Sequence, residues 1–205
     1  MKYNNLRFLY TTFSILIIIS TYFSFKFHNS DIASEPYFAL ALLNNDNVAA
    51  NYFSNNVQTI SVNEKINWII YLHNNMADIK FVSIKVKLLN STINPPNETL
   101  CIPSPAPVLF DKSYVIKNNE TWLYPFELSI VEINTVNDYL QLTSIFINNE
   151  KIYSGIISKY GYNFRLVFEL WVYDHDLDNF TFNWEKGSEM RCTWNQIWFN
   201  ATITN

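Results

Sequence analysis

Apolar and polar residues alternate along much of the chain after residue 35. In Lys80–Leu89, the even positions from Val82 to Leu88 are apolar, and the odd positions between them are polar. This period of two predicts β-strands with one face turned to a core. Clusters of asparagine separate the runs and are typical of turns. The predicted strands are Tyr37–Leu43, Val57–Val62, Ile66–Leu72, Lys80–Leu89, Val115–Ile116, Trp122–Ile130, Tyr139–Ile147, Lys151–Ile157, Phe164–Tyr173 and Cys192–Ile203.

No helical period of useful length occurs after residue 30, so the pattern predicts an all-β fold. About ten short strands separated by turns are typical of an antiparallel β-sandwich. Pro125 lies inside Trp122–Ile130 and predicts an edge strand or a bulge there. The sequence Asn148-Asn149-Glu150 between two runs predicts a hairpin.

Prolines interrupt the strand pattern at one place. Residues 90–110 hold five of the seven prolines, too many for the centre of a sheet. The segments on either side would each be incomplete alone, so we interpret 90–110 as a long Pro-rich loop within one domain, 31–205. Residues 174–205 are interpreted as a C-terminal β extension of that domain.

The first 30 residues contain three basic residues and no acidic one. The 18 uncharged residues between Arg7 and Lys26 would span about 27 Å as a helix, close to the thickness of a bilayer core. They predict a cytoplasmic stub and a signal-anchor transmembrane helix within 1–30, single-pass in the cell membrane, N-terminus inside and 31–205 extracytoplasmic. A cleaved signal peptide and a buried soluble helix are the alternatives; the bulky residues around Lys26 fit a signal-peptidase site poorly.

Charge and composition exclude several classes of function. The net charge is −4, with 49% hydrophobic and 16% charged residues. An acidic chain without a Lys/Arg cluster is not a nucleic-acid binder. Three glycines are too few for a phosphate-binding loop or a dinucleotide fingerprint. Because no catalytic motif is present, we expect a protein that is not an enzyme, although paired carboxylates of the glycosidase kind stay open.

The order of several segments carries a resemblance. Trp122 followed by Pro125-Phe126 forms a W-x-x-P-F element, and Leu170-Trp171-Val172 forms a later apolar run. With Tyr37–Leu42, Asn56–Glu64, Ile66–Asn75, Val82–Leu88 and Leu140–Tyr153, they resemble an archaeal family of membrane-associated, immunoglobulin-like domains of unknown function (the "sixteen-sixteen" type). The resemblance covers Tyr37–Tyr173 and leaves the Pro-rich loop and the tail without a counterpart. It implies an extracytoplasmic, immunoglobulin-like β-sandwich on a membrane anchor and brings no established activity.

The chain has two cysteines, Cys101 in the Pro-rich loop and Cys192 in the last predicted strand. Outside the cell, an even number of cysteines permits a disulfide bond. A Cys101–Cys192 bond would tie the loop to the strand, and two unpaired thiols are the alternative. No cysteine–histidine spacing in the chain suits zinc.

Five N-x-[ST] sequons give candidate glycosylation sites in a chain expected outside the cell. About four would arise by chance in a chain with 28 asparagines, so the motif alone decides little. The candidates are Asn90, Asn97, Asn119, Asn179 and Asn200.

An acidic stretch follows the predicted strand Phe164–Tyr173. Asp174, Asp176 and Asp178 match positions 1, 3 and 5 of a calcium-binding loop, and Glu185 matches position 12. Asn179 replaces the glycine of position 6, and strand-like runs flank the segment instead of helices. A Ca²⁺ site and a solvated acidic turn are the two interpretations; no other cofactor is expected.

Aromatic residues are frequent in the tail, where they fit a core, a carbohydrate-stacking platform or a membrane-interface belt. They are Phe180, Phe182, Trp184, Trp194, Trp198 and Phe199. The sequence predicts a membrane-anchored, surface-displayed domain with a non-enzymatic binding or envelope-structural role and a protein or glycan partner. The alternative is an extracytoplasmic carbohydrate-binding module or an enzyme of unknown reaction.

Overall fold

The computed structural model of the chain describes residues 17, 19–21, 35–53, 57–186 and 189–203. The chain divides into two units, Met1–Glu35 and Pro36–Asn205. Within the described ranges, no helix has both the length and the apolar character needed to cross a membrane. Most of the predicted signal anchor in residues 1–30 lies outside the described residues, so membrane anchoring stays a prediction.

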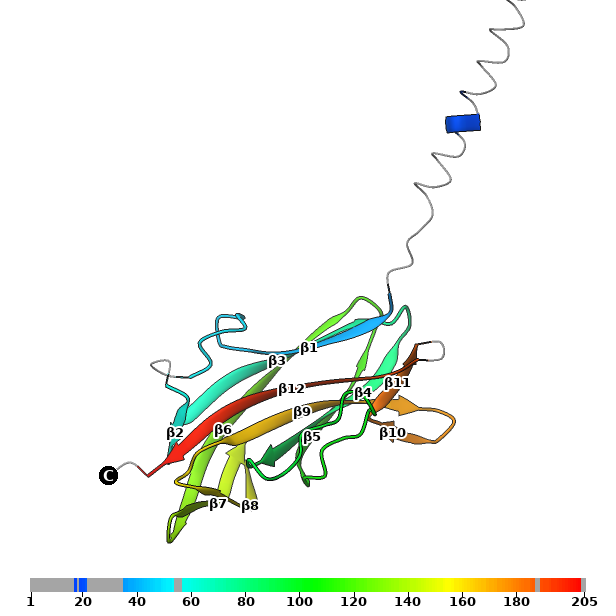
Figure 1. Ribbon diagram of the computed structural model, residues 1–205. Coiled ribbons are helices and arrows are strands. Elements are labelled where there is room, and N and C mark those ends of the chain that lie inside the picture. The colour runs from blue at the N-terminus through cyan, green and yellow to red at the C-terminus, as the bar shows by residue number, and fades with distance from the viewer. Residues whose placement is uncertain (1–16, 18, 22–34, 54–56, 187–188, 204–205) are drawn as a thin grey trace, which may run out of the picture. The chain divides into compact units, whose positions relative to one another are not determined.

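The first sheet of the second unit has five antiparallel strands in the order β1-β3-β6-β7-β8 (Figure 1). Asn148 and Asn149 connect the last two strands with positive φ angles of 47° and 69°. A tight I′ turn requires that conformation, and asparagine tolerates it well, so the predicted hairpin is confirmed. The strands are β1 (Tyr37–Leu43), β3 (Lys65–Asn75), β6 (Thr121–Val136), β7 (Tyr139–Ile147) and β8 (Glu150–Lys159).

The second sheet has the order β11-β12-β9-β4-β5, with two short strands attached to it. One of these, β2, runs parallel to β12, so the chain crosses from the first sheet to the second after β1. The strands are β11 (Asn183–Lys186), β12 (Glu189–Thr202), β9 (Phe164–Asp174), β4 (Lys80–Leu89), β5 (Val108–Ile116), β2 (Thr59–Ser61) and β10 (Asn179–Thr181), which pairs with β9.

The strand order is that of an immunoglobulin-like sandwich, in which strands A, B and E share one sheet and strands G, F and C share the other. Strands β1, β3 and β6 take the places of A, B and E, and β12, β9 and β4 take those of G, F and C. The predicted all-β, immunoglobulin-like antiparallel sandwich is confirmed for the second unit. Strand β12 is an integral part of it, although the sequence suggested an extension.

The core lies between the two sheets. The even-numbered residues of β4 from Val82 to Leu88 are buried, as their alternation predicts. Trp68 of β3 stacks on Phe126 of β6 with ring centroids 6.3 Å apart, and Phe126 meets Phe168 of β9 edge-on at 5.3 Å. These rings join the two sheets, and aromatic pairs of this geometry stabilise a core beyond the area that they bury.

Pro125 lies at a local edge of the first sheet. It predicted an edge strand or a bulge, and although β6 as a whole lies between β3 and β7, its first part is paired on one side only. Pairing with β7 begins only at Leu128, whereas Pro125 is opposite Ile69 of β3. Because this part of β6 has a neighbour on one side only, the missing N–H of proline costs no ladder bond.

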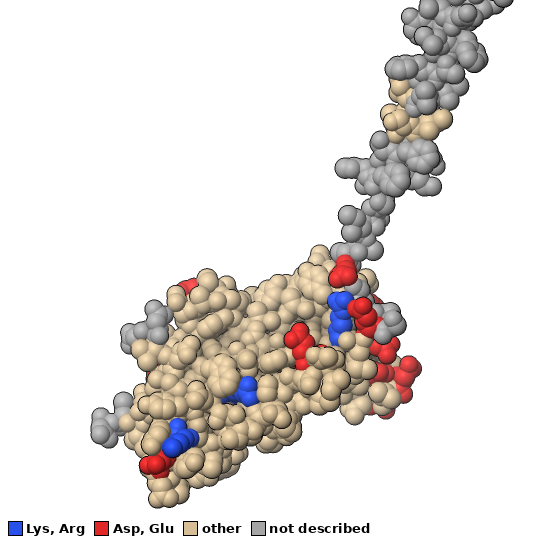
Figure 2. All heavy atoms as spheres, viewed as in Figure 1, with Lys and Arg blue, Asp and Glu red and all other residues tan. Residues whose placement is uncertain are grey.

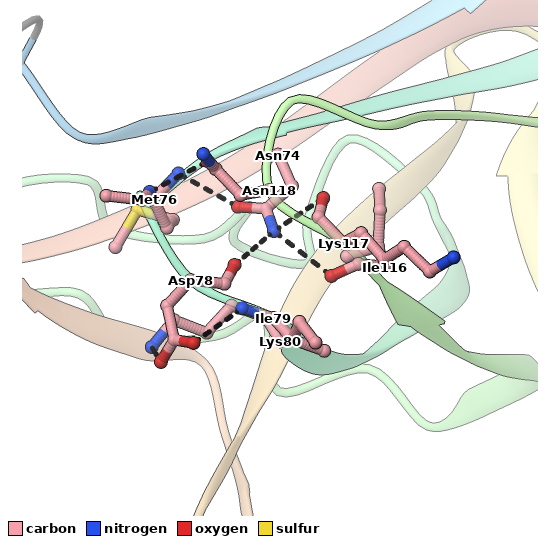
Figure 3. Close-up of polar contacts among 9 residues, drawn as sticks. Asn74, Met76, Asp78, Ile79, Lys80, Ile116, Lys117 and Asn118 are labelled. Carbon is pink, nitrogen blue, oxygen red and sulfur yellow. Dashed lines mark hydrogen bonds and ion pairs between the residues drawn. The ribbon is translucent and has the colours of Figure 1, made fainter.

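A buried asparagine ties the sheets together at one end of the sandwich (Figure 3). Asn74 at the end of β3 is fully buried, and its amide nitrogen donates to the carbonyl oxygens of Asp78, Ile116 and Lys117 at 2.8, 3.1 and 3.0 Å. Its side-chain oxygen accepts the Met76 N–H at 2.9 Å. One side chain thus joins β3 of the first sheet to the turn before β4 and to the end of β5 in the second.

Candidate functional site

The outer face of the second sheet is covered in part by the Pro-rich loop. Because β5 begins at Val108, the loop predicted over 90–110 occupies residues 90–107. Ile93 and Ala106 of the loop pack against Leu89, Val167 and Trp194 of the sheet and form a small second core. A chain segment without regular strands is thereby fixed on the sheet by burial of apolar side chains.

A buried ion pair lies beneath the Pro-rich loop. The Lys87 ammonium of β4 is 2.9 Å from the Glu169 carboxylate of β9, and these residues are 3% and 0% exposed. Lys87 also donates to the Ser104 carbonyl oxygen at 2.6 Å, and the Ser104 N–H donates to Glu169 at 2.8 Å. The indole N–H of Trp171 gives Glu169 a further bond at 3.0 Å. Both charges are paired and hydrogen-bonded, which is the condition for keeping them buried.

Arg165 of β9 lies farther along the same face and is also buried. Its Nη2 donates to the Ile93 carbonyl of the Pro-rich loop at 2.6 Å, and its Nη1 donates to the side-chain oxygen of Gln196 at 3.4 Å. The guanidinium carbon is 4.7 Å from the ring centroid of Trp198, a cation–π contact. Burial lowers the pKa of Arg165. Arg165 therefore holds the loop, Gln196 and Trp198 in one arrangement.

A surface hollow of about 630 Å³ opens beside Trp198, and we call it the Trp198 hollow. Trp198 is 37% exposed, so its ring is available on this surface. Its polar lining residues are four carboxamides and Tyr52, and no charged residue lines the hollow. The lining residues are Asn51, Tyr52, Phe53, Gln58, Asn163, Gln196, Ile197 and Trp198. The face that carries β12 and β9 shows few charges in Figure 2.

The core fixes one wall of the Trp198 hollow. The indole N–H of the buried Trp68 donates to the Tyr52 carbonyl oxygen at 2.7 Å, and the Phe53 ring meets Trp68 edge-on at 5.8 Å. A second hollow, of about 240 Å³, shares Tyr52 but contains the charged residues Asp46 and Lys65. We take the Trp198 hollow as the candidate site because it is larger and has an exposed aromatic ring.

The acidic stretch forms a turn after β9. The Asp174 carboxylate accepts the backbone N–H groups of Asp176 and Leu177 at 2.8 and 3.2 Å, and Asp178 accepts the Tyr173 hydroxyl. Glu185 lies in β11. Acidic side chains gather at the end of the domain that carries β10 and β11 (Figure 2). Within the described ranges no three metal-ligating side chains converge, so the predicted Ca²⁺ ligands Asp174, Asp176, Asp178 and Glu185 are not assembled.

Cys101 and Cys192 are brought together but are free thiols, so the predicted disulfide is not formed in this structure. Both sulfur atoms lie 3.7 Å from the carbonyl oxygen of Glu98. Burial, a hydrogen bond with Cys101 and nearby negative charge raise the pKa of Cys192 to about 12. The shared carbonyl oxygen accepts a hydrogen bond from each thiol.

The sequon asparagines fall into two groups. Asn97, Asn119 and Asn179 are exposed, whereas Asn90 and Asn200 are partly buried. Asn90 donates its amide N–H to the β8 carbonyl of Ile157 at 2.8 Å, and Asn200 accepts the Asn163 N–H at 3.1 Å. Glycosylation stays a prediction, and the first group offers the more accessible acceptors.

The aromatic tail has more than one role. Phe182, Trp184 and Phe199 are buried, and Trp194 lies against the Pro-rich loop. Trp198 is the most exposed of the six and therefore the member most available for stacking. Glu169 and Arg165 were not among the residues singled out from the sequence. A charged residue inside the continuous apolar run of β9 was the available signal, since such a charge needs a buried partner.

No family model and no curated protein sequence matches the chain, so the resemblance to the archaeal family stays a prediction. Solved structures of similar arrangement include the CARDB domain of the PF1109 protein from Pyrococcus furiosus in complex with di-metal ions, with TM-score 0.41, 6% identity, and coverage of 83% of this chain and 96% of that one. A β-glucosidase from Listeria innocua matches with a TM-score of 0.38 and 9% identity, over 82% of this chain and 17% of the β-glucosidase. The β-glucosidase EmGH1 from Erythrobacter marinus matches with a TM-score of 0.37 and 7% identity, over 82% of this chain and 16% of the β-glucosidase. The chain thus matches only a small part of either β-glucosidase.

Proposed function

We propose that the chain is a membrane-anchored, surface-displayed, immunoglobulin-like module that binds a neutral glycan in the Trp198 hollow and catalyses no reaction. One observation carries this proposal: an exposed indole ring stands among four carboxamide side chains, and no charged residue lines the hollow. The four carboxamides are Asn51, Gln58, Asn163 and Gln196.

This chemistry suits a sugar. The C–H face of a pyranose packs on an aromatic ring, and each carboxamide both donates and accepts hydrogen bonds, as hydroxyl groups do. An anionic ligand would need a cation in the hollow, and the guanidinium of Arg165 is engaged with Ile93, Gln196 and the ring of Trp198. The site is also fixed before binding, by Arg165 behind Trp198 and by Trp68 behind Tyr52, which lowers the entropic cost of binding.

Display outside the cell rests on the sequence. The basic N-terminal end followed by 18 uncharged residues supports an anchor with the sandwich on the outer side. A glycan-binding surface that is displayed outside the cell can contact extracellular polysaccharides.

The test is binding of the detergent-solubilised full chain to an array of immobilised neutral oligosaccharides, followed by calorimetry with the best probe. Trp198→Ala should lower the affinity at least tenfold. Tyr153→Ala is the matched control, because Tyr153 is an exposed aromatic residue of β8 outside the hollow, 73% exposed. Binding to no neutral oligosaccharide, or equal loss in both variants, would overturn the proposal; retention of a protein in place of a glycan would do the same.

A further inference from the structure

We propose that Cys101 and Cys192 form a reducible latch that fastens the Pro-rich loop to β12. The two residues are 91 positions apart in the sequence, and they are the two cysteines of the chain. Each sulfur is 3.7 Å from the same Glu98 oxygen, so the sulfurs are no farther apart than about twice that distance. A hydrogen bond joins the two thiols, so their sulfur atoms are neighbours, as formation of an S–S bond of about 2.05 Å requires.

The backbone supports the assignment. Cys101 has a φ of 48°, which lies in the left-handed region that residues other than glycine seldom adopt. The short turn around it is closed by two backbone bonds between Asn97 and Ile102, at 2.8 and 3.1 Å. This turn directs the thiol inward, where it is buried, and toward the half-buried Cys192.

The surroundings make the latch useful. Near its C-terminal end, the Pro-rich loop is attached to the sheet by Ser104, which forms hydrogen bonds with both Lys87 and Glu169. Ile93 near its start is held by Arg165. Cys101 lies between these two attachments, and the Cys192 thiol of β12 bonds the Glu98 carbonyl oxygen in the same part of the loop. A covalent link there would fix the remaining part of the loop.

The oxidant is a small disulfide such as oxidised glutathione. One protein thiolate attacks a sulfur of the small disulfide, breaks its S–S bond and releases one small thiolate. The second protein thiolate then attacks the mixed disulfide, which forms the Cys101–Cys192 bond and releases the second small thiolate. The two thiol protons leave with the two small thiolates, so the protein loses two electrons and the small disulfide gains them. A high thiol pKa at Cys192 makes this exchange slow at neutral pH and faster as the pH rises.

The experiment compares the full chain after incubation with oxidised glutathione and after reduction with dithiothreitol. The oxidised chain should be about 2 Da lighter by intact mass, carry no free thiol after denaturation, and unfold at a midpoint about 10 °C higher, because the bond closes a long loop. Dithiothreitol should reverse all three changes. Cys101→Ser and Cys192→Ser should each show none of them.

Two results would overturn the latch: glutathione attached to each cysteine in place of an internal bond, or two free thiols after oxidation of the folded chain. The mass measurement on the unmodified chain decides the matter even where a serine variant fails to fold. The outcome is independent of the Trp198 hollow, since no glycan takes part in it.

Discussion

The Lys87 ammonium lies 2.9 Å from the Glu169 carboxylate, and the Pro-rich loop covers both. This pair explains how a segment rich in proline and without strands is held on a sheet. Ser104 contributes a carbonyl oxygen to the cation and an N–H to the anion, so the loop completes the hydrogen bonding of both charges. The loop and the pair therefore depend on each other.

Removal of one member of this pair should be severe. Glu169→Gln leaves Lys87 charged and buried without its anion, and we expect a loss of about 3 to 5 kcal/mol in the free energy of unfolding. Urea unfolding at pH 7 measures it. The exposed pair Lys65–Glu127, also at 2.9 Å, is the matched control, and Lys65→Gln should cost no more than about 1 kcal/mol. Similar costs at the two pairs would show that burial does not decide the effect.

The asparagine at the end of β3 gives a second prediction. Asn74→Asp replaces the donating nitrogen with an oxygen that faces the carbonyl oxygens of Asp78, Ile116 and Lys117. We expect it to destabilise the domain more than Asn74→Ala, which should cost about 1 to 3 kcal/mol by leaving buried groups unsatisfied. Thermal unfolding of the two variants checks the order, and an aspartate variant more stable than the alanine variant would contradict it.

Glu120 should make stability depend on pH. Its carboxylate accepts the Lys117 N–H at 2.7 Å and the Tyr114 hydroxyl at 3.0 Å, and these bonds hold the pKa of Glu120 below its ordinary value. A lowered folded pKa gives stability that is present above the unfolded pKa of about 4.3 and is lost as the pH falls through the folded value. The difference in unfolding free energy between the wild type and Glu120→Gln should therefore shrink between pH 6 and pH 2. A constant difference would contradict this assignment.

The orientation in the membrane can be tested directly. If residues 1–30 anchor the chain with the N-terminus inside, a protease added to intact cells should digest the sandwich and remove a C-terminal epitope tag. A cytoplasmic protein probed in the same cells serves as the control for leakage. Protection of the tag in sealed cells, with digestion after lysis, would show the opposite orientation.

The local pattern predicted much of the fold, because alternation is a property of each strand by itself. Strands Tyr37–Leu43, Lys80–Leu89 and Tyr139–Ile147 begin and end where their patterns do. Lys87 shows the limit: its position on the outer face is right, yet it is buried because the Pro-rich loop that follows β4 folds back over it. Its partner Glu169 is far away in the sequence, and one sequence holds no signal for that pairing.

The candidate site was less accessible to prediction for the same reason. Trp198 was noted as a possible stacking residue, but its neighbours Asn51 and Gln58 come from the segment around β2, at the other end of the domain sequence. The parallel pairing of β2 with β12 brings them together. The sequon at Asn90 similarly turned out to have its amide bonded to Ile157 of β8.

The most direct test of the proposed binding site is to observe the indole N–H resonances of the six tryptophans while a neutral oligosaccharide from the array is added. Trp198→Phe assigns the Trp198 signal. We expect that signal to shift in a saturable manner, while the signal of the buried Trp184, which lies outside the hollow, stays in place. A Trp198 signal that stays fixed while the glycan binds would contradict the account.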